Sequence, residues 1–305
     1  MIPHPERVLF PDDGLTRAEL ALYYARVAPR LLPHLVGRRL TVRRWPHGID
    51  EAGFYQKHVE AEGSQEGEGA REGSPRRPIT ISSAADLVRW VGWGLVEIHV
   101  PLARQDADPD WAVIDLDPTL PAGWDAVAEA AEVMFSVLDR LGYRYFVKTS
   151  GADGLHVYLP IRPAKVHAVQ EHIRWLAVLI SALAPDLVTV VRRVKDRGPR
   201  VYVDYLQNGP GRTMSGIYCV RARQGAPVSW PVAPRSIGAL APGRFRIRTV
   251  DPEAAPLWVW DPPNDLDAIA RRHGLQDLAA GASGRHGAGE PIAFPYEGGR
   301  VHDDL

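Results

Sequence analysis

The sequence predicts an α/β protein of the α+β type, with mixed, largely antiparallel sheets flanked by helices. Apolar residues at helical spacing indicate amphipathic helices over 122–141 and 166–183. Between them, two short apolar segments, 143–148 and 155–159, are joined by a glycine-bearing turn and predict a β-hairpin. Because a hairpin pairs its strands antiparallel, we expect antiparallel pairing to dominate the sheets.

The composition is that of an ordinary globular protein without a global charge signature. The formal net charge of the 305 residues is -1, so affinity for a polyanion must come from local basic patches. The single Cys219 excludes a disulfide framework and a cysteine-rich zinc site. No apolar run is long enough to span a membrane, and the N-terminus lacks the apolar core of a signal peptide. We therefore expect a cytoplasmic protein without a membrane partner.

Two segments are expected to lack regular structure. Residues 60–78 are rich in Gly, Glu, Ser and Arg and contain almost no apolar residue, which predicts a mobile surface loop. From about residue 279 the chain turns to Gly, Ala and Ser. We therefore expect one domain over 1–278, with the mobile loop at 60–78, followed by a loose tail over 279–305.

The N-terminal part is predicted to be an extended arm, a helix and a basic strand. Thr16 and Glu19 form a capping box at the start of the helix, after an arm over 4–11. Residues 37–45 alternate basic and apolar residues, as a strand does when one face is buried. The basic face either meets an anion or protects the edge of a sheet, and the pattern fits both.

Two aromatic residues, Phe54 and Tyr55, stand close to Lys57 and His58. This combination suits stacking on a base beside a phosphate, although such aromatics more often pack in a core. After a helix capped by Ser83, the alternating residues 95–100 predict a strand with His99 on the face opposite its apolar neighbours. A lone histidine on a strand is more often structural than functional.

The segment 111–117 is an apolar strand that contains Asp115 and Asp117 and ends at Pro118. Residues two apart on a strand point to the same face, so the two carboxylates project side by side. Two like charges that close stay ionised only with a cation between them, and a divalent metal ion is the natural counterion. The alternatives are a cap for the following helix and a sugar-nucleotide transferase, in which Asp-x-Asp also occurs.

The hairpin turn over 149–154 is a candidate anion site. It gathers hydroxyls, including that of Ser150, exposed backbone N–H groups and the nearby His156, which together suit a triphosphate. It is not a P-loop, because no Gly-Lys-Ser/Thr opens a helix. The alternative is a turn that uses glycine for backbone reasons only.

A third acid follows a basic cluster. Residues 191–200 concentrate cations, and the strand predicted over 201–206 carries Asp204 among apolar neighbours. Its place after the cluster favours a polyanion site, although a lone strand carboxylate can equally protect an edge. A further strand is predicted over 217–223, with Arg221 and Arg223 aligned on one face.

Together these segments resemble the polymerase domain of bacterial DNA ligase D, the non-homologous end-joining member of the archaeo-eukaryotic primase superfamily. Their order and spacing match from the N-terminus to about Asp261. The resemblance implies an archaeo-eukaryotic primase-like fold. The segments that carry it are Arg7–Pro11, Phe54–His58, Glu97–His99, Asp115–Pro118, Ser150–His156, Val203–Leu206 and Val220–Arg223.

The resemblance also implies a role for each candidate site residue. Two divalent ions, Mn²⁺ or Mg²⁺, are expected at Asp115, Asp117 and Asp204. The incoming triphosphate is expected at His99, Ser150, His156, Arg197 and Arg221. A downstream 5′-phosphate is expected where the family usually has lysines, at Arg7 and Arg17. Template bases are expected at Phe54, Tyr55 and Lys57.

The activity implied is that of a template-directed nucleotidyltransferase that fills gaps and extends ends in DNA break repair. Its substrates would be NTP or dNTP, with ribonucleotides favoured, and gapped or overhanging duplex DNA with a 5′-phosphate. An ATP-dependent DNA ligase and a Ku-type end-binding protein are the implied partners, in the bacterial cytoplasm at the nucleoid.

Two departures from the family keep other functions open. Asp153 stands where a phosphate-binding lysine is common, and Gln207 where an arginine often follows the third acid, so Lys148 or Arg212 would have to compensate. These changes are the best argument for a catalytically weak end-bridging module, but retention of all three acids argues against it, and a primase-type initiator of primers is the alternative within the enzyme class. A sugar-nucleotide transferase would leave Asp204 and the basic N-terminal arm unexplained.

Overall fold

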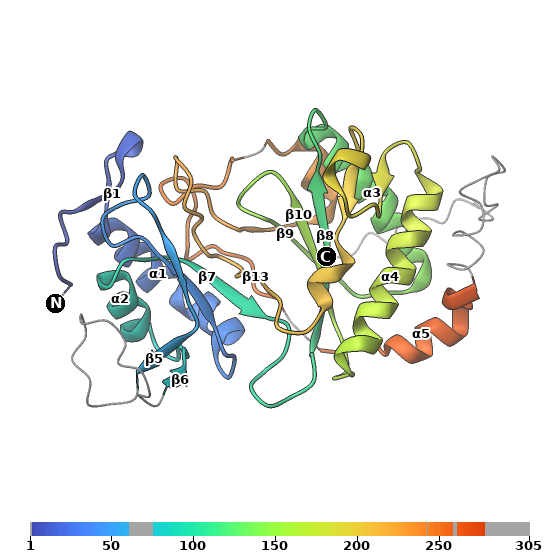
Figure 1. Cartoon of the computed structure of the whole chain (residues 1–305), viewed down its shortest axis with the longest axis horizontal. Coiled ribbons are helices and arrows are strands. Elements are labelled where there is room, and N and C mark those ends of the chain that lie inside the picture. Colours follow the sequence, from blue (N-terminus) through green and yellow to red (C-terminus); the bar gives the residue numbers. More distant parts are fainter. Residues whose placement is uncertain (1, 61–75, 242, 259–260, 278–305) are drawn as a thin grey trace.

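Two sheets face one another in the computed structural model, which describes residues 2–60, 76–241, 243–258 and 261–277 (Figure 1). The larger sheet contains, in spatial order, β11 (Val188–Thr189), β12 (Val201–Val203), β8 (Trp111–Pro118), β10 (Leu155–Pro160), β9 (Phe146–Thr149) and β14 (Pro231–Val232). The smaller sheet contains, in spatial order, β13 (Thr213–Ser215), β7 (Leu95–Pro101), β3 (Thr41–Arg44) and β4 (Phe54–Gln56).

Two short hairpins lie outside these sheets. They are β1 (Val8–Phe10) with β2 (Leu15–Thr16), and β5 (His58–Glu60) with β6 (Arg76–Pro78). Among the strand pairs of the described residues, β11 and β12 run parallel and the others run antiparallel. The predicted fold class, mixed and largely antiparallel sheets flanked by helices, is confirmed.

The helices begin and end close to their predicted limits. The predicted capping box of Thr16 and Glu19 is present, and the predicted cap Ser83 forms a capping box with Asp86 at the start of the next helix. The α-helices are α1 (Arg17–Leu35), α2 (Ala84–Gly92), α3 (Trp124–Leu141), α4 (Val166–Leu183) and α5 (Leu266–His273). Short 3-10 helices are η1 (Pro11–Asp13), η2 (Val194–Asp196), η3 (Tyr205–Asn208) and η4 (Pro234–Ala239). In the part of the chain that the structure describes, no helix is long and apolar enough to cross a membrane.

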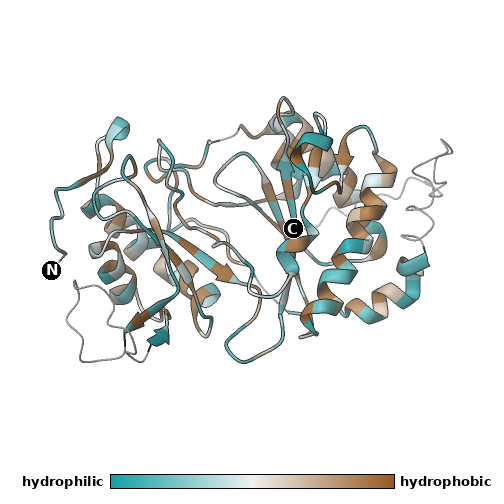
Figure 2. Ribbon diagram, in the orientation of Figure 1, coloured by the Kyte–Doolittle hydropathy of each residue, from teal (hydrophilic) through white to brown (hydrophobic). Residues whose placement is uncertain are grey.

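The larger sheet separates two hydrophobic cores. On β8, Ile114 and Leu116 pack with the apolar faces of α3 and α4, while Trp111 and Val113 belong to the core shared with α1, α2 and the smaller sheet. The amphipathic character of α3 and α4 is visible as alternating teal and brown along their ribbons (Figure 2). Because side chains alternate along a strand, the odd-numbered residues of β8 face the smaller sheet. The acids of this strand therefore open toward the space between the two sheets.

Three predictions about local structure were wrong. Residues 76–78 form β6 and pair with β5, so both ends of the predicted loop over 60–78 are ordered strands, and the rest of that loop lies outside the described residues. The strand predicted over 217–223 is an irregular segment with one β-bridge at Val220, because the φ of 62° at Tyr218 breaks an extended backbone. The strand predicted over 201–206 ends at Val203. The predicted tail also lies outside the described residues.

Candidate active site

A row of polar side chains crosses three neighbouring strands of the larger sheet. Asp115 of β8 is the direct partner of His156 on β10, and His156 is in turn the partner of Lys148 on β9. Residues opposite one another on adjacent strands point to the same face. All three are buried, at 5%, 5% and 0% exposure. The sheet register therefore places an acid, a histidine and a lysine side by side beneath the space between the sheets.

The buried carboxylate of Asp115 has an unsatisfied oxygen. Its Oδ1 lies 3.3 Å from Nε2 of His156 but has no hydrogen-bond partner within the described residues. Burial raises the pKa of Asp115 well above its ordinary value, and the neighbouring charges of Asp117 and Asp204 raise it further. The charges of Lys148 and Arg221 offset this rise only in part, and an added cation would supply the remaining compensation.

Lys148 fixes the orientation of His156. Its Nζ lies 2.7 Å from Nδ1 of His156 and donates to Oγ of Ser229, which donates to the carbonyl of Thr149 at 2.7 Å. Burial lowers the pKa of Lys148 to about 7 and, with the charge of Lys148, lowers that of His156 well below its usual value. With Nδ1 accepting from Lys148, the neutral histidine carries its proton on Nε2, facing Asp115. Lys148 is fully enclosed, so it does not compensate for Asp153 by touching phosphate.

The other two acids lie next to this row. Asp117 is the cross-strand partner of Tyr202 on β12, and the backbone N–H of Asp204 donates to the carbonyl of Asp115 at 2.9 Å. The side chain of Asp204 caps η3 and accepts hydrogen bonds from the Tyr202 hydroxyl, the Leu206 N–H and Nε2 of Gln207. Burial and the charge of Asp204 raise the pKa of Asp117. The three acids are thus electrostatic neighbours.

The donor set suits a hard divalent cation. Carboxylate oxygens are the ligands that Mg²⁺ and Mn²⁺ prefer, and the unpartnered Oδ1 of Asp115 is the oxygen most in need of one. Among the described residues, however, no group of three or more His, Cys, Asp or Glu side chains is already gathered at metal-binding positions. The carboxylate of Asp204 is engaged by Tyr202 and Gln207. The predicted ligand role of the three acids therefore remains a prediction.

The hairpin tip forms the wall beside the acids. The hydroxyl of Ser150 accepts from the N–H groups of Ala152 and Gly154 at 3.0 and 3.1 Å, which holds the turn in shape. A Cβ on Gly154 would stand 2.4 Å from the carbonyl of Leu116, so only glycine lets the turn approach β8 this closely. The turn thus uses glycine for a backbone reason while it also borders the candidate site.

Glu97 is a site residue that the sequence reasoning missed. Its buried carboxylate lies 2.9 Å from Nε2 of His99, accepts from Nε of Arg221 at 3.2 Å and accepts from the N–H of Ala222 at 2.9 Å. Burial alone would raise its pKa, but the contacts with His99 and Arg221 outweigh this and bring the pKa to about 2. Glu97 thus holds the side chains of His99 and Arg221, two predicted nucleotide-binding residues, in position. Its only signal in the sequence is an acid within a largely apolar strand.

A cavity of about 330 Å³ joins these groups. Of the predicted metal and nucleotide residues it is lined by His99, Asp115, Asp117, Ser150, His156 and Arg221.

Two predicted site residues, Asp204 and Arg197, are not in the lining of this cavity. Arg197 instead stacks on the Tyr202 ring at 3.7 Å and donates to the carbonyls of Val191 and Arg192. The cavity is also lined by Asp153, Gln207 and Arg223, and Asp153 forms an ion pair with Arg223 at 3.0 Å. The anion introduced by Asp153 is thus matched by a local cation.

The predicted template residues lie at the surface. Phe54 and Tyr55 are 45% and 60% exposed, so the core-packing alternative for them is wrong. Arg44 stands over the Phe54 ring and Arg43 over the Tyr55 ring, at 5.2 and 5.0 Å. β3 is an interior strand of its sheet, which excludes the edge-protection alternative for its arginines. These aromatic and cationic side chains form an exposed surface beside the cavity, because Tyr55 also contacts His99, with ring centroids 5.7 Å apart.

The two N-terminal arginines converge on one carbonyl. Arg7 and Arg17 donate to the oxygen of Pro46 at 2.9 and 2.7 Å, and burial together with the charge of Arg7 lowers the pKa of Arg17. Arg17 is only 3% exposed, so its side chain supports the Pro46 carbonyl from the protein interior and is not accessible to a ligand. His47, which the sequence reasoning missed, is exposed and has Nδ1 3.2 Å from Nη1 of Arg7. The accessible part of this basic cluster is therefore Arg7 with His47.

The first backbone N–H groups of α1 do not contribute to that cluster. The N–H of Arg17 donates to the carbonyl of Arg7, that of Ala18 to Pro5 and that of Glu19 to the Thr16 side chain. Donors that are already paired do not bind an added anion. A contribution from the helix start to phosphate binding is therefore ruled out for these three groups.

A solved structure identifies the class of protein. The polymerase domain of Mycobacterium tuberculosis ligase D, in complex with DNA, superimposes with a TM-score of 0.70 and 27% sequence identity. The match covers 92% of this chain and 98% of that domain. The chain therefore has the fold of a primase-type polymerase, and its two strand carboxylates face basic and hydroxyl groups across the cavity.

The family follows from the sequence. The model of the LigD primase-polymerase domain matches residues 16–257, and the chain belongs to this family. The multifunctional non-homologous end joining protein LigD of Pseudomonas aeruginosa is 34% identical over 246 residues, 78% of this chain and 29% of that protein. The bifunctional LigD of Bacillus subtilis is 28% identical over 249 residues, 80% of this chain and 41% of that protein. The chain thus spans well under half the length of these relatives, and the predicted resemblance is confirmed.

Proposed function

We propose that this chain is a template-directed polymerase that transfers nucleotides onto DNA ends and gaps during break repair. The observation that carries the proposal is the pair Asp115 and Asp117, which open beside His156 into a cavity whose other walls present Ser150 and Arg221. Acids on one side and anion-binding groups on the other suit the two ends of a reacting nucleotide. The family relatives are end-joining proteins, which supports the repair role.

In this mechanism the protein positions the reacting groups and neutralises the charge of the triphosphate. Asp115 and Asp117 would hold two divalent ions, Mn²⁺ or Mg²⁺, and Asp204 would join them if its carboxylate exchanged its hydrogen bonds with Tyr202 and Gln207 for the ions. When bound, these ions lower the pKa of a 3′-hydroxyl and stabilise charge at the α-phosphate. Arg221, held by Glu97, would neutralise the triphosphate. The Nε2–H of His156 would donate toward the oxygens gathered at Asp115.

The substrates and partners belong to the same proposal. We expect NTP or dNTP, with ribonucleotides favoured, and gapped or overhanging duplex DNA with a 5′-phosphate. An ATP-dependent ligase and a Ku-type end-binding protein would act with the chain on nucleoid DNA in the cytoplasm. The supporting observations are that the model of the LigD primase-polymerase domain matches residues 16–257 and that the chain covers 29% of a larger end-joining protein.

Labelling of a gapped duplex tests the activity. The chain is incubated with radiolabelled nucleotide, with and without Mn²⁺ or Mg²⁺, on a primed and on an unprimed template. Metal-dependent extension of the primer supports the proposal. Dinucleotide synthesis on the unprimed template would assign a primase-type initiator instead, and duplex binding without incorporation would assign an end-bridging module.

A downstream 5′-phosphate is expected to improve DNA binding at least about tenfold, which requires only about 1.4 kcal/mol. Arg7 and His47 are the accessible receptors, so Arg7→Ala and His47→Ala should each reduce the ratio of the dissociation constants for 5′-hydroxyl and 5′-phosphate duplexes. Arg26→Ala, on the outer face of α1, is the matched control. Equal affinity of the wild type for both ends, or an undiminished ratio in the two variants, would contradict a phosphate site here.

Asp153→Lys is expected to lower the Michaelis constant for nucleotide at least about threefold, within the ~0.2–1 kcal/mol range of exposed charge pairs. The exchange removes the partner of Arg223 and places a third cation on the cavity wall, beside Arg221 and Arg223. Steady-state kinetics at saturating DNA measure the effect. Arg223→Ala is the companion variant and should raise the constant. An increase in Asp153→Lys would show that the Asp153 carboxylate itself assists binding.

A further inference from the structure

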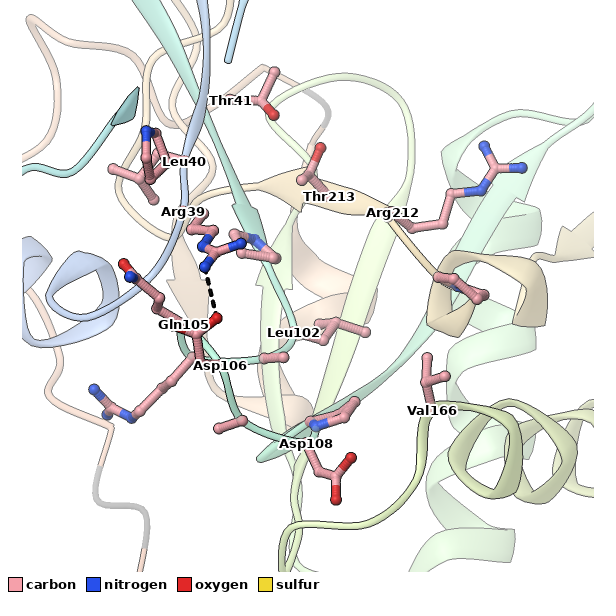
Figure 3. Close-up of a pocket in the computed structure, with 18 of the residues that line it drawn as sticks. Arg39, Leu40, Thr41, Leu102, Gln105, Asp106, Asp108, Val166, Arg212 and Thr213 are labelled. Carbon is pink, nitrogen blue, oxygen red and sulfur yellow. Dashed lines mark hydrogen bonds and ion pairs between the residues drawn. The ribbon is translucent and has the colours of Figure 1, made fainter. Parts of the chain in front are cut away.

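The cavity of about 330 Å³ that contains the acids is called the catalytic cavity below. A second cavity, of about 500 Å³, continues it along the smaller sheet (Figure 3). The two share Thr213 in their linings. On β7, His99 borders the catalytic cavity, and Pro101, two residues further along, borders the second. We call this second cavity the upstream groove. It is therefore a continuation of the candidate active site, not a separate surface pocket.

We call the side of the catalytic cavity that presents Ser150 and Arg221 the triphosphate wall. The upstream groove lies at the opposite end of β8 from this wall. Its lining includes Pro109, which precedes β8, whereas the catalytic cavity is bordered by Asp117 at the end of that strand. At about 3.3 Å per residue, these eight positions span roughly 25 Å. None of the hairpin-tip residues 150–154 lines the upstream groove. A molecule occupying it would approach the acids from the side away from Ser150.

The walls of the upstream groove suit a nucleic-acid strand. The two acids along it are already paired, Asp106 with Arg39 at 2.6 Å and Asp108 with Lys165 at 2.9 Å, and the first pair is drawn in the centre of Figure 3. Arg212 is exposed at the rim, and its side chain forms no hydrogen bond or ion pair with another described residue. Apolar surface is contributed by Leu40, Pro78, Pro101, Leu102 and Val166. Apolar walls with two exposed cations, Arg212 and the predicted template residue Lys57, fit sugars and bases with a phosphate backbone.

We propose that the upstream groove seats the strand that supplies the attacking 3′-hydroxyl. The inference rests on the proposed polymerase function and adds the path of the primer to it. In nucleotidyl transfer, the attacking and leaving oxygens lie roughly in line on opposite sides of the phosphorus. With the leaving pyrophosphate at the Ser150 and Arg221 wall, the 3′-hydroxyl arrives from the other side of the acids. The upstream groove is the cavity on that side, and Arg212 contacts a backbone phosphate of the primer several nucleotides from its end.

The test compares three DNA ligands for wild type, Arg212→Glu and Arg212→Lys. They are a primed template with a long primer of twelve nucleotides, the same template with a primer of two nucleotides, and the template with its downstream strand only. Arg212→Glu should weaken binding of the long-primer duplex at least about tenfold and reduce its salt dependence by about one phosphate contact. Arg212→Lys should retain most of the affinity. Arg162→Ala, which lies outside both cavities, is the matched control, and the thermal midpoints of all variants report folding.

The pattern across ligands decides the occupant. A loss confined to the long-primer duplex, with an unchanged Michaelis constant for nucleotide, supports the primer path. Equal losses on all three DNA ligands would assign the groove to the template strand, and a higher Michaelis constant with unchanged DNA affinity would assign Arg212 to the triphosphate; either outcome overturns the inference. These outcomes leave the proposed function standing, since that would fail only if the wild type showed no metal-dependent extension.

Discussion

Replacing Asp117 with alanine is expected to lower the rate of primer extension by about three orders of magnitude or more. Asp117 shares one face of β8 with Asp115, and burial and the charge of Asp204 already raise its pKa. Such crowded carboxylates stabilise charge in the transition state only through a bound cation, an effect worth several kcal/mol, and each 1.36 kcal/mol changes a rate tenfold. Single-turnover extension of a gapped duplex at saturating Mn²⁺ measures the loss.

A second readout on Asp117 does not depend on activity. Without divalent ions, Asp117→Asn removes a charge that the neighbouring acids repel, so its thermal midpoint should rise above that of the wild type. Addition of Mn²⁺ should stabilise the wild type and have a smaller effect on the variant. Asp125→Ala, on the exposed first turn of α3, should change neither quantity. Near wild-type extension by Asp117→Ala, together with an unchanged response to Mn²⁺, would refute the metal role.

Glu97→Ala is expected to lower the free energy of unfolding by about 3–5 kcal/mol and to raise the Michaelis constant for nucleotide more than tenfold. Removing one member of a buried ion pair leaves the other uncompensated, and here Arg221 and the Ala222 N–H both lose their acceptor. His99 loses its anchor at the same time. Denaturant unfolding and steady-state kinetics measure the two effects.

The pH dependence of Glu97 has a defined sign. Its pKa of about 2 in the folded protein lies below the ordinary 4.5, so its contribution to stability is present above about pH 4.5 and disappears as the pH falls toward 2. Glu97→Gln should show a smaller loss of stability between pH 4.5 and pH 2 than the wild type, because amide and backbone contacts do not titrate there. A variant with wild-type nucleotide kinetics would show that Arg221 keeps its position without Glu97.

The acids were predictable because their signal is local. An apolar strand that carries two carboxylates on one face can be recognised without tertiary structure. The register of β8 with β10 and β12 then brings His156 and the backbone of Asp204 next to these acids. Gln207, treated in the sequence as a lost cation, instead donates to Asp204. This hydrogen bond depends on the turn after β12, where the sequence pattern had predicted that the strand continues.

The missed residues depend on contacts between distant segments. Glu97 looks like an ordinary strand acid until Arg221, 124 residues later, is placed against it. Lys148 looks like a surface cation at the end of a hairpin strand, yet packing of the segment around Ser229 encloses it completely. Periodicity reports which face a side chain occupies, but not which other segment covers that face.

The two walls of the catalytic cavity differ in how much chain must be brought together to build them. The row from Asp115 to Lys148 is assembled from three antiparallel strands within about fifty residues, and the contact of Lys148 with His156 closes a hairpin of only eight positions. The Glu97–Arg221 pair closes a loop of 124 positions, with a correspondingly larger entropic cost. The pairing of Asp115 with His156 is therefore encoded locally, whereas the Glu97–Arg221 side of the cavity forms only after distant segments of the domain have met. A nascent chain released before Arg221 would contain Asp115, Asp117 and Asp204 but lack the pair that we propose holds a nucleotide against them.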